Sequence, residues 1–139
     1  MSKLRFLIRL ASRTGKGGLE TKQYLLLIYN AESQWEAMTE AEHGKMKQEF
    51  GAFTQGIIAS GNFKGGNQLH PTSKATTVRV ENGKTLVTDG PFAETKEQLG
   101  GYYLIEAADL DEATAIAARI PSVRAGSVEV RPIVPMHQP

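Results

Sequence analysis

Side chains able to do chemistry concentrate in one stretch of the sequence, residues 87–97. The stretch holds three carboxylates, one amine and one aromatic ring, which belong to Asp89, Glu94, Glu97, Lys96 and Phe92. Gly90 and Pro91 lie among them: Gly90 tolerates backbone angles that other residues avoid, and Pro91 fixes its own φ. These residues predict a stiff bend, which serves either to close the fold or to hold acid–base chemistry.

Residues 75–88 have the pattern of a β-hairpin that leads into this bend. Two alternating segments flank Asn82-Gly83, the strongest short signal for a hairpin turn. A two-residue turn fixes the strand register, so Thr76 is expected to face Asp89. The valines expected on the same face as Asp89 are Val78, Val80 and Val87. Asp89 is therefore predicted to point to the apolar side of the hairpin.

Two roles for Asp89 remain open. A carboxylate works as a base near neutral pH when burial destabilises its charge, and Val87 and Phe92 are the apolar neighbours expected to provide that burial. Alternatively, the carboxylate caps the bend by accepting hydrogen bonds from the backbone amides that follow it. The first role is catalytic and the second is structural.

His43 is the predicted partner of Asp89. Thr39 and Glu42 have the spacing of a capping box, so a helix is expected to begin at about Glu40. An apolar stripe marks the inward face of this helix: Met46, Phe50, Phe53 and Ile57. Extended backwards, the stripe reaches His43, whose imidazole is predicted to face the sheet. His43 is either a partly buried histidine bonded to a neighbour, or a neutral proton acceptor held at a helix N-terminus.

Five further residues are candidates for substrate binding: Phe92, Glu94, Lys96, Glu97 and Arg131. In one interpretation the loop residues form a solvated turn with a local ion pair worth less than about 1 kcal/mol. In the other they line the entrance to a pocket and hold a polar substrate. Arg131, near the end of the chain, is expected to bind an anionic group or to pair with a loop carboxylate.

The remaining elements are predicted from periodicity. Residues 22–30 indicate a central strand buried on both faces, and residues 60–71 a glycine-rich loop or irregular edge. Residues 102–107 form a strand, and residues 127–134 a last strand that Pro132 places at an edge or bulge. A second helix is expected after a cap at Asp109, with Glu112 as the reciprocal partner and an inward face of Ala113, Ile116, Ala117 and Ile120.

This order of strand, helix, two hairpin strands, strand, helix and strand predicts an α+β fold with both helices on one face of the sheet. A ferredoxin-like βαββαβ sandwich is the simplest arrangement of this kind. Two helices cover only one face, so a second copy of the chain is expected to cover the other. We therefore predict a homodimer that packs sheet to sheet.

Composition excludes several classes of function. A chain of 139 residues fits a single domain, and the absence of cysteine excludes disulfides and thiolate sites and favours the cytoplasm. The longest apolar run, residues 24–29, is too short to span a membrane. The spacing of histidines and carboxylates predicts no metal site, and no glycine-rich loop predicts a nucleotide or flavin cofactor. We expect neither a membrane partner nor a nucleic-acid partner.

Charge divides the sequence into a leader and a domain. Residues 1–20 carry five basic side chains and one acidic one, whereas the rest of the chain has 11 basic and 14 acidic residues. We divide the chain into a basic leader (1–21), a domain (22–135) and a short tail (136–139). The leader is an amphipathic arm, an ill-ordered tail, or the result of a start codon placed too early.

The sequence of residues 87–102, which contains Asp89-Gly90-Pro91-Phe92, resembles the YCII-related family and its DGPF subgroup, named for that motif. Residues 24–29 and 128–132 are also similar to that family, so the resemblance covers about residues 22–135. It implies a dimeric ferredoxin-like α+β barrel. One branch of the family includes a dehydrochlorinase of hydroxylated aromatics with a proposed histidine and aspartate pair. Other members of the subgroup are associated with extracytoplasmic-function sigma factors.

These observations support two hypotheses. In the first, the protein is a lyase or hydrolase of small molecules, with Asp89 as base, His43 as its partner, and Arg131 or Lys96 binding an anionic group. In the second, it is a ligand-binding or regulatory module whose loop caps a pocket or contacts a protein partner such as a sigma factor.

Overall fold

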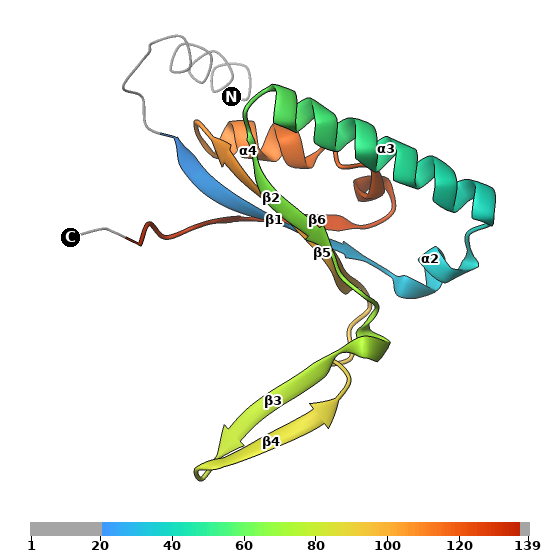
Figure 1. Ribbon diagram of the computed structural model, residues 1–139, viewed down its shortest axis with the longest axis vertical. Coiled ribbons are helices and arrows are strands. Elements are labelled where there is room, and N and C mark those ends of the chain that lie inside the picture. The colour runs from blue at the N-terminus through green and yellow to red at the C-terminus, as the bar shows by residue number, and fades with distance from the viewer. Residues whose placement is uncertain (1–20, 137–139) are drawn as a thin grey trace.

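A four-stranded antiparallel sheet forms the body of the molecule, in a computed structural model that describes residues 21–136 (Figure 1). The strands are β1 (Lys22–Asn30), β2 (Phe63–Gln68), β5 (Gln98–Ala107) and β6 (Ser127–Pro132), in the spatial order β2-β5-β1-β6. Every neighbouring pair is antiparallel. The predicted α+β class is confirmed, and the arrangement is compatible with a ferredoxin-like fold.

β1 is central, as predicted, because β5 and β6 pair with its two edges. Alternate side chains of β1 and β5 are buried under the helices: Tyr24, Leu26, Ile28, Tyr103, Ile105 and Ala107. The expected burial of β1 on both faces is wrong, since Leu25 and Leu27, on the opposite face, are only partly buried. No helix of residues 21–136 lies over this second face, which we call the open face.

Helix α3 (Glu40–Ala59) begins at the predicted capping box. The Thr39 hydroxyl accepts a hydrogen bond from the Glu42 amide at 3.1 Å, and the Glu42 carboxylate accepts one from the Thr39 amide at 2.8 Å. These bonds lower the pKa of Glu42 below its ordinary value. Phe53 and Ile57 of the predicted stripe are buried against the sheet.

Helix α4 (Leu110–Ala117) covers the same face as α3 (Figure 1). The Asp109 carboxylate caps it by accepting a hydrogen bond from the Glu112 amide at 2.9 Å. The Glu112 carboxylate in turn accepts from the amide of Ala108, one residue earlier than predicted. All four predicted inward residues are buried: Ala113, Ile116, Ala117 and Ile120. After α4, a 3-10 turn, η2 (Pro121–Arg124), begins at the proline expected to stop the helix.

One element was not predicted, and another was predicted only as a loop or an irregular edge. A short helix, α2 (Glu32–Ala37), occupies the connection between β1 and α3. The strand β2 forms one edge of the sheet, with a register shift between Phe63 and Gly65, so the predicted irregular edge is confirmed. Of the two glycines in this strand, Gly66 is tightly packed, because a Cβ there would lie 2.9 Å from the Tyr102 carbonyl oxygen and from the Tyr103 ring.

The predicted hairpin is present, but it is not part of the main sheet. β3 (Thr76–Glu81) and β4 (Lys84–Asp89) form a separate two-stranded sheet in the predicted register, with Thr76 opposite Asp89. A short 3-10 turn, η1 (Thr72–Lys74), precedes it. The expectation that the hairpin strands belong to the main sheet is therefore wrong, because β2 and β5, which flank the hairpin in the sequence, pair directly with each other. The hairpin is an insertion between them.

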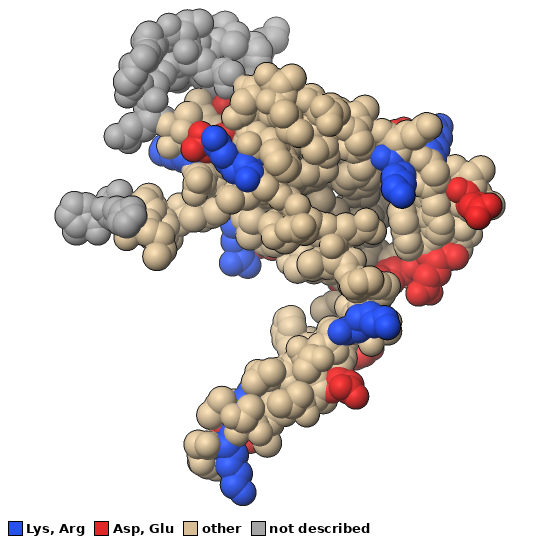
Figure 2. Space-filling model, viewed as in Figure 1, with Lys and Arg blue, Asp and Glu red and all other residues tan. Residues whose placement is uncertain are grey.

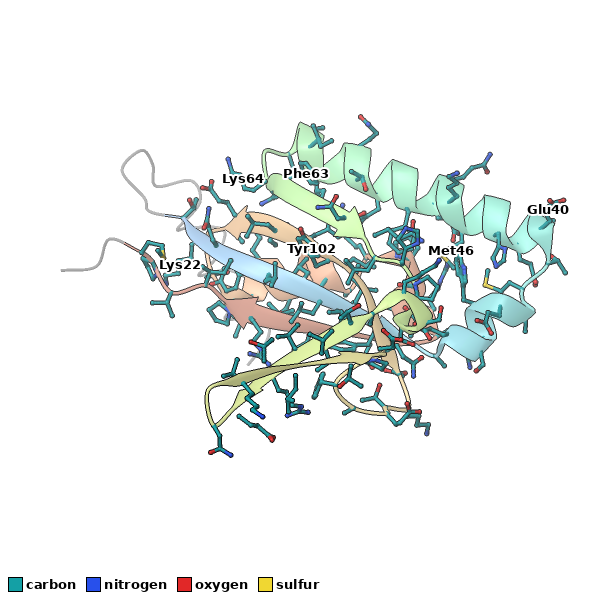
Figure 3. The ribbon with its side chains drawn as sticks, turned by 60° about the horizontal axis from the view of Figure 1, so that its bottom comes forward. Lys22, Glu40, Met46, Phe63, Lys64 and Tyr102 are labelled. Carbon is teal, nitrogen blue, oxygen red and sulfur yellow. The ribbon has the colours of Figure 1, made fainter. Side chains whose placement is uncertain are left out.

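The hairpin stands away from the body, on the side of the sheet opposite α3 (Figures 1 and 3). All of its strand residues except the partly buried Thr77 are exposed. The predicted leader, apart from Thr21, and most of the predicted tail lie outside the described residues. Across residues 21–136, no helix has the length and apolar character needed to cross a membrane.

Candidate functional site

The bend after the hairpin depends on Gly90. Its φ is 101°, in the region that favours glycine, and its amide donates a hydrogen bond to the Ala75 carbonyl at 2.7 Å. The Thr77 hydroxyl donates to the Gly90 carbonyl at 2.8 Å. The predicted stiff bend is therefore present, and these two bonds close the base of the hairpin without using the Asp89 side chain.

Asp89 is the last residue of β4 and is exposed to solvent. It lies on the same hairpin face as Val78 and Val87, as predicted, but that face is itself exposed. The expected burial of Asp89 is therefore wrong, because the hairpin leaves the body. Among residues 21–136, the Asp89 carboxylate accepts no hydrogen bond, so the structure does not show the expected cap either.

His43 packs on α2 and not on the sheet, so its predicted direction is wrong. Its Nε2 donates a hydrogen bond to the Trp35 carbonyl at 2.7 Å, and its ring stacks on the Trp35 ring with centroids 4.3 Å apart. His43 is half-buried, and the expectation of a partly buried histidine bonded to a neighbour is confirmed. Since the carbonyl can only accept, Nδ1 is the nitrogen left to accept a proton.

The structure does not bring Asp89 and His43 together. Asp89 lies at the base of the exposed hairpin, whereas His43 lies in the first turn of α3 against Trp35. In the part of the chain that the structure describes, no hydrogen bond joins them. A catalytic role for this pair stays a prediction, without geometric support from a single copy of the chain.

The loop residues proposed for substrate binding do not converge on one point. Glu97 accepts a hydrogen bond from the Ser127 hydroxyl at 3.0 Å and so ties the loop to β6. Phe92 is 76% exposed, and Glu94 and Lys96 are exposed as well. Glu97 thus has a structural contact, and the other three present their side chains to solvent.

Arg131 pairs with Glu129 of its own strand, with Nε 2.9 Å from a carboxylate oxygen. The predicted pairing with a loop carboxylate is therefore wrong, because residues two apart in a strand share a face. Tyr29 on β1 donates a hydrogen bond to the same carboxylate at 3.4 Å. Burial, and then the charge of Glu129, raise the pKa of Tyr29 above its ordinary value.

The open face has an apolar centre surrounded by polar pairs. Leu25 lies opposite Leu104 across the β1–β5 pair, and Leu27 lies opposite Tyr102. The polar contacts around them are Lys64 with Glu106 at 3.5 Å, Asn67 with the Tyr102 hydroxyl at 2.9 Å, and Arg131 with Glu129. Figure 3 labels Lys64 and Tyr102. Sequence reasoning missed these pairs, although the Glu129 and Arg131 spacing is the signal that could have revealed one.

Glu32 fixes the base of the hairpin to the body. Its carboxylate accepts two hydrogen bonds from Thr72, one from the amide and one from the hydroxyl, each at 2.8 Å. Its amide donates to the Gln98 side chain at 2.8 Å, and Gln98 donates to the Thr95 carbonyl at 2.6 Å. One residue of α2 therefore holds both chain segments that connect the hairpin to the body. No spacing in the sequence pointed to Glu32.

The hairpin presents an uncovered valine face. We use this name for Val78, Val80 and Val87, which are 60%, 66% and 63% exposed and share one side of the hairpin with Asp89. In the view of Figure 2 most of the hairpin surface is uncharged, with basic atoms at its tip (Figure 2). Within residues 21–136, no three histidine, aspartate or glutamate side chains lie close enough to hold a metal ion.

Comparison with known proteins identifies a family and leaves the activity open. The family model described as the YCII-related domain matches residues 22–137. An uncharacterized protein of Rhizobium meliloti (strain 1021) is 41% identical over 112 residues, which cover 79% of this chain and 90% of that protein. The family match spans the sheet, both helices that cover it and the hairpin. The chain therefore belongs to the YCII-related family.

Proposed function

We propose that this protein is a non-enzymatic binding module whose interaction element is the β3–β4 hairpin. The observation that carries the proposal is the valine face, on which three β-branched apolar side chains are 60–66% exposed. Covering such a side chain is worth about 1 kcal/mol or more. A partner that covers the valine face therefore gains binding free energy without any change in the body of the molecule.

The low expected stability of an isolated hairpin also favours a binding partner. A two-stranded hairpin with nothing packed against it is marginally stable in water. Here Gly90, Thr77 and the contact between Glu32 and Thr72 hold its base in place. The Asp89-Gly90-Pro91-Phe92 motif then serves to position an arm for binding. On this proposal the chain belongs to the DGPF subgroup, and the motif has a structural role, not a catalytic one.

Proton transfer by Asp89 and His43 is the competing function, and the structure offers it less support. The Asp89 carboxylate is exposed, and the His43 imidazole is engaged with Trp35. An exposed carboxylate lacks the burial that turns it into an effective base near neutral pH. A lyase or hydrolase activity would require another arrangement of these two side chains.

A binding experiment with matched variants tests the proposal. The purified chain, Val87→Lys and Thr88→Lys are each assayed for self-association and for binding to an extracytoplasmic-function sigma factor, the partner that the resemblance suggests. Val87 lies on the valine face and Thr88 on the opposite face. We expect Val87→Lys to lose association in at least one assay, while Thr88→Lys keeps it. Equal behaviour of the two variants in both assays would refute the proposal.

The enzymatic alternative has its own readout. Chloride release from a chlorinated hydroxyaromatic is measured with the unmodified chain and with Asp89→Asn. On the present proposal neither protein releases chloride above the uncatalysed rate. Turnover by the unmodified chain that disappears in Asp89→Asn would replace the binding proposal with the acid–base mechanism.

A further inference from the structure

The turn of the β3–β4 hairpin contains Asn82, the only asparagine of the sequence that is followed directly by glycine. We infer that Asn82 is a site of spontaneous chemical modification, at which the main-chain nitrogen of Gly83 attacks the asparagine side chain. The reaction alters the turn that keeps the two strands of the hairpin, which we call the arm, in register. This chemistry is independent of the proposed function, whereas its effect on binding rests on that function.

The reaction needs only water as a co-reactant. The Gly83 nitrogen forms a bond to Cγ of Asn82 and gives up its proton, and the side-chain nitrogen leaves as ammonia. The product is a cyclic imide, which water then opens at one of its carbonyl carbons. Opening at the side-chain carbon gives aspartate. Opening at the main-chain carbon gives isoaspartate, in which the main chain runs through the former side chain.

The attacking amide has no competing hydrogen bond. Gly83 lies between the strands β3 and β4, and its amide donates to no group of residues 21–136. A Cβ at Gly83 would meet no atom within 4 Å, so nothing crowds the approach of this nitrogen to the Asn82 side chain. Asn82 is exposed, so water has access to the imide for the second step.

The other asparagines of the chain are held by hydrogen bonds and precede larger residues. The side-chain nitrogens donate from Asn30 to the Ser122 carbonyl at 3.2 Å, from Asn62 to the Glu106 carbonyl at 2.7 Å, and from Asn67 to the Tyr102 hydroxyl at 2.9 Å. The Asn82 side chain has no such partner among the described residues. It is therefore free to turn toward the Gly83 nitrogen.

Asp89 and Gly90 form a second pair that the same ring closure could affect, with loss of water in place of ammonia. Here the structure predicts the opposite outcome. The Gly90 amide donates a hydrogen bond to the Ala75 carbonyl at 2.7 Å, so this nitrogen is engaged and its position is fixed. The sequence makes both pairs candidates, and the hydrogen bond at the base of the arm separates them.

The two products differ in their effect on the arm. Aspartate followed by glycine suits the same two-residue turn, and aspartate tolerates the φ of 50° that Asn82 has. Isoaspartate adds a carbon to the main chain of the turn, so the turn no longer matches the twist and register of the strands. We therefore expect the arm to loosen in proportion to isoaspartate and not in proportion to the total loss of ammonia.

The first experiment measures the chemistry in the folded full chain. The protein is aged in warm buffer at neutral and at mildly alkaline pH, peptides are mapped by mass spectrometry, and isoaspartate is scored with an isoaspartate methyltransferase. We expect modification at Asn82, faster at the higher pH because the deprotonated amide is the attacking form, while Asn67 and Asp89 remain intact. An unchanged Asn82, or equal loss at Asn67, would overturn the inference.

The second experiment follows amide exchange in β3 and β4 as the protein ages, which requires no partner. Asn82→Gly is the matched control, because Gly-Gly suits the same class of turn and has no carboxamide. We expect exchange in the arm to rise with age in the unmodified chain and to stay constant in Asn82→Gly. Freshly prepared Asn82→Asp adds the charge without isoaspartate and should exchange as the fresh unmodified chain does. Isoaspartate that forms without faster exchange would contradict the effect on the arm.

These outcomes separate the inference from the proposed function. Aged protein that contains isoaspartate and a loosened arm, yet associates as fresh protein does, would preserve the modification site and remove the arm as the binding element. An intact Asn82, together with loss of association in Val87→Lys and not in Thr88→Lys, would remove the modification site and preserve the binding module. Loss of association on ageing in the unmodified chain, and not in Asn82→Gly, would support both.

Discussion

At the scale of single residues, Gly90 determines how the arm leaves the body. Its φ of 101° and its amide bond to Ala75 form one unit, and Asp89 beside it remains exposed. In this motif the backbone of Gly90 forms the bend, and the Asp89 side chain takes no part in it. The same motif had suggested a catalytic carboxylate, because side-chain type is visible in a sequence and exposure is not.

Gly90→Ala should therefore destabilise the protein by about 1–2 kcal/mol, since a side chain is strained at this φ. A Cβ at Gly90 would meet no atom within 4 Å, so the cost comes from the backbone and not from a clash. Gly100→Ala is the matched control, because a Cβ there also meets no atom within 4 Å and its φ is not positive. Urea unfolding measures both variants; equal stability would contradict this account of the bend.

Glu32 is the second residue on which the arm depends. Glu32→Ala removes two hydrogen bonds to Thr72, and the loss of bonds to a charged group should cost about 2–3 kcal/mol. Because Thr72 leads into the hairpin, amide exchange should rise in β3 and β4 more than in β1. Glu36→Ala, an exposed position in the same helix, serves as the control. Uniform exchange changes across both sheets would show that Glu32 stabilises the whole fold and not the arm.

At the scale of elements, the capping box of α3 makes the stability of the fold depend on pH. The hydrogen bonds with Thr39 lower the pKa of Glu42 from its ordinary value of 4.5. A carboxylate whose pKa is lower in the folded state stabilises the fold above its unfolded pKa, and this contribution is lost as pH falls through the folded value. Stability should therefore fall below about pH 4.5 more steeply in the unmodified protein than in Glu42→Gln.

Thr39→Ala removes the other half of the box and should cost about 1 kcal/mol near neutral pH. Thermal unfolding between pH 3 and 7 measures both variants against Glu40→Gln, which lies outside the reciprocal pair. Identical pH profiles for Glu42→Gln and the unmodified protein would contradict the assigned cause of the pKa shift.

These elements also show where sequence reasoning succeeds and where it stops. Periodicity and caps predicted β1, α3, α4 and the hairpin register, because each rests on neighbours in the chain. β2 was predicted only as a loop or irregular edge, since Gly65 and Gly66 have low strand propensity, and Gly66 is needed for a close approach to Tyr103. α2 was not expected, and it is this helix that places Trp35 on His43 and Glu32 on Thr72. The candidate site therefore changed more than the fold did.

At the scale of the whole molecule, the question is what covers each face of a sheet. Alternation in the sequence correctly placed the valines on one side of the hairpin, but it does not state what lies over them. α3 and α4 cover one face of the main sheet. Within the described residues of one copy, the open face is only partly buried and the valine face is exposed. The hairpin that carries the valine face lies on the side of the sheet away from α3, as the open face does (Figures 1 and 3).

If a second copy covers them, folding stability should depend on protein concentration. Binding between folded chains stabilises the native state by mass action, so tenfold dilution of a dimer that unfolds to monomers costs about 1.4 kcal/mol. For a chain of this size that lowers Tm by roughly a few degrees. Calorimetry over a hundredfold range of concentration should show this shift for the unmodified protein and for Thr88→Lys. Val87→Lys should show a smaller shift, because at the same concentrations more of it is monomeric before it unfolds. A Tm that is independent of concentration in the unmodified protein would mean that the folded chain does not need a partner copy to cover its open face.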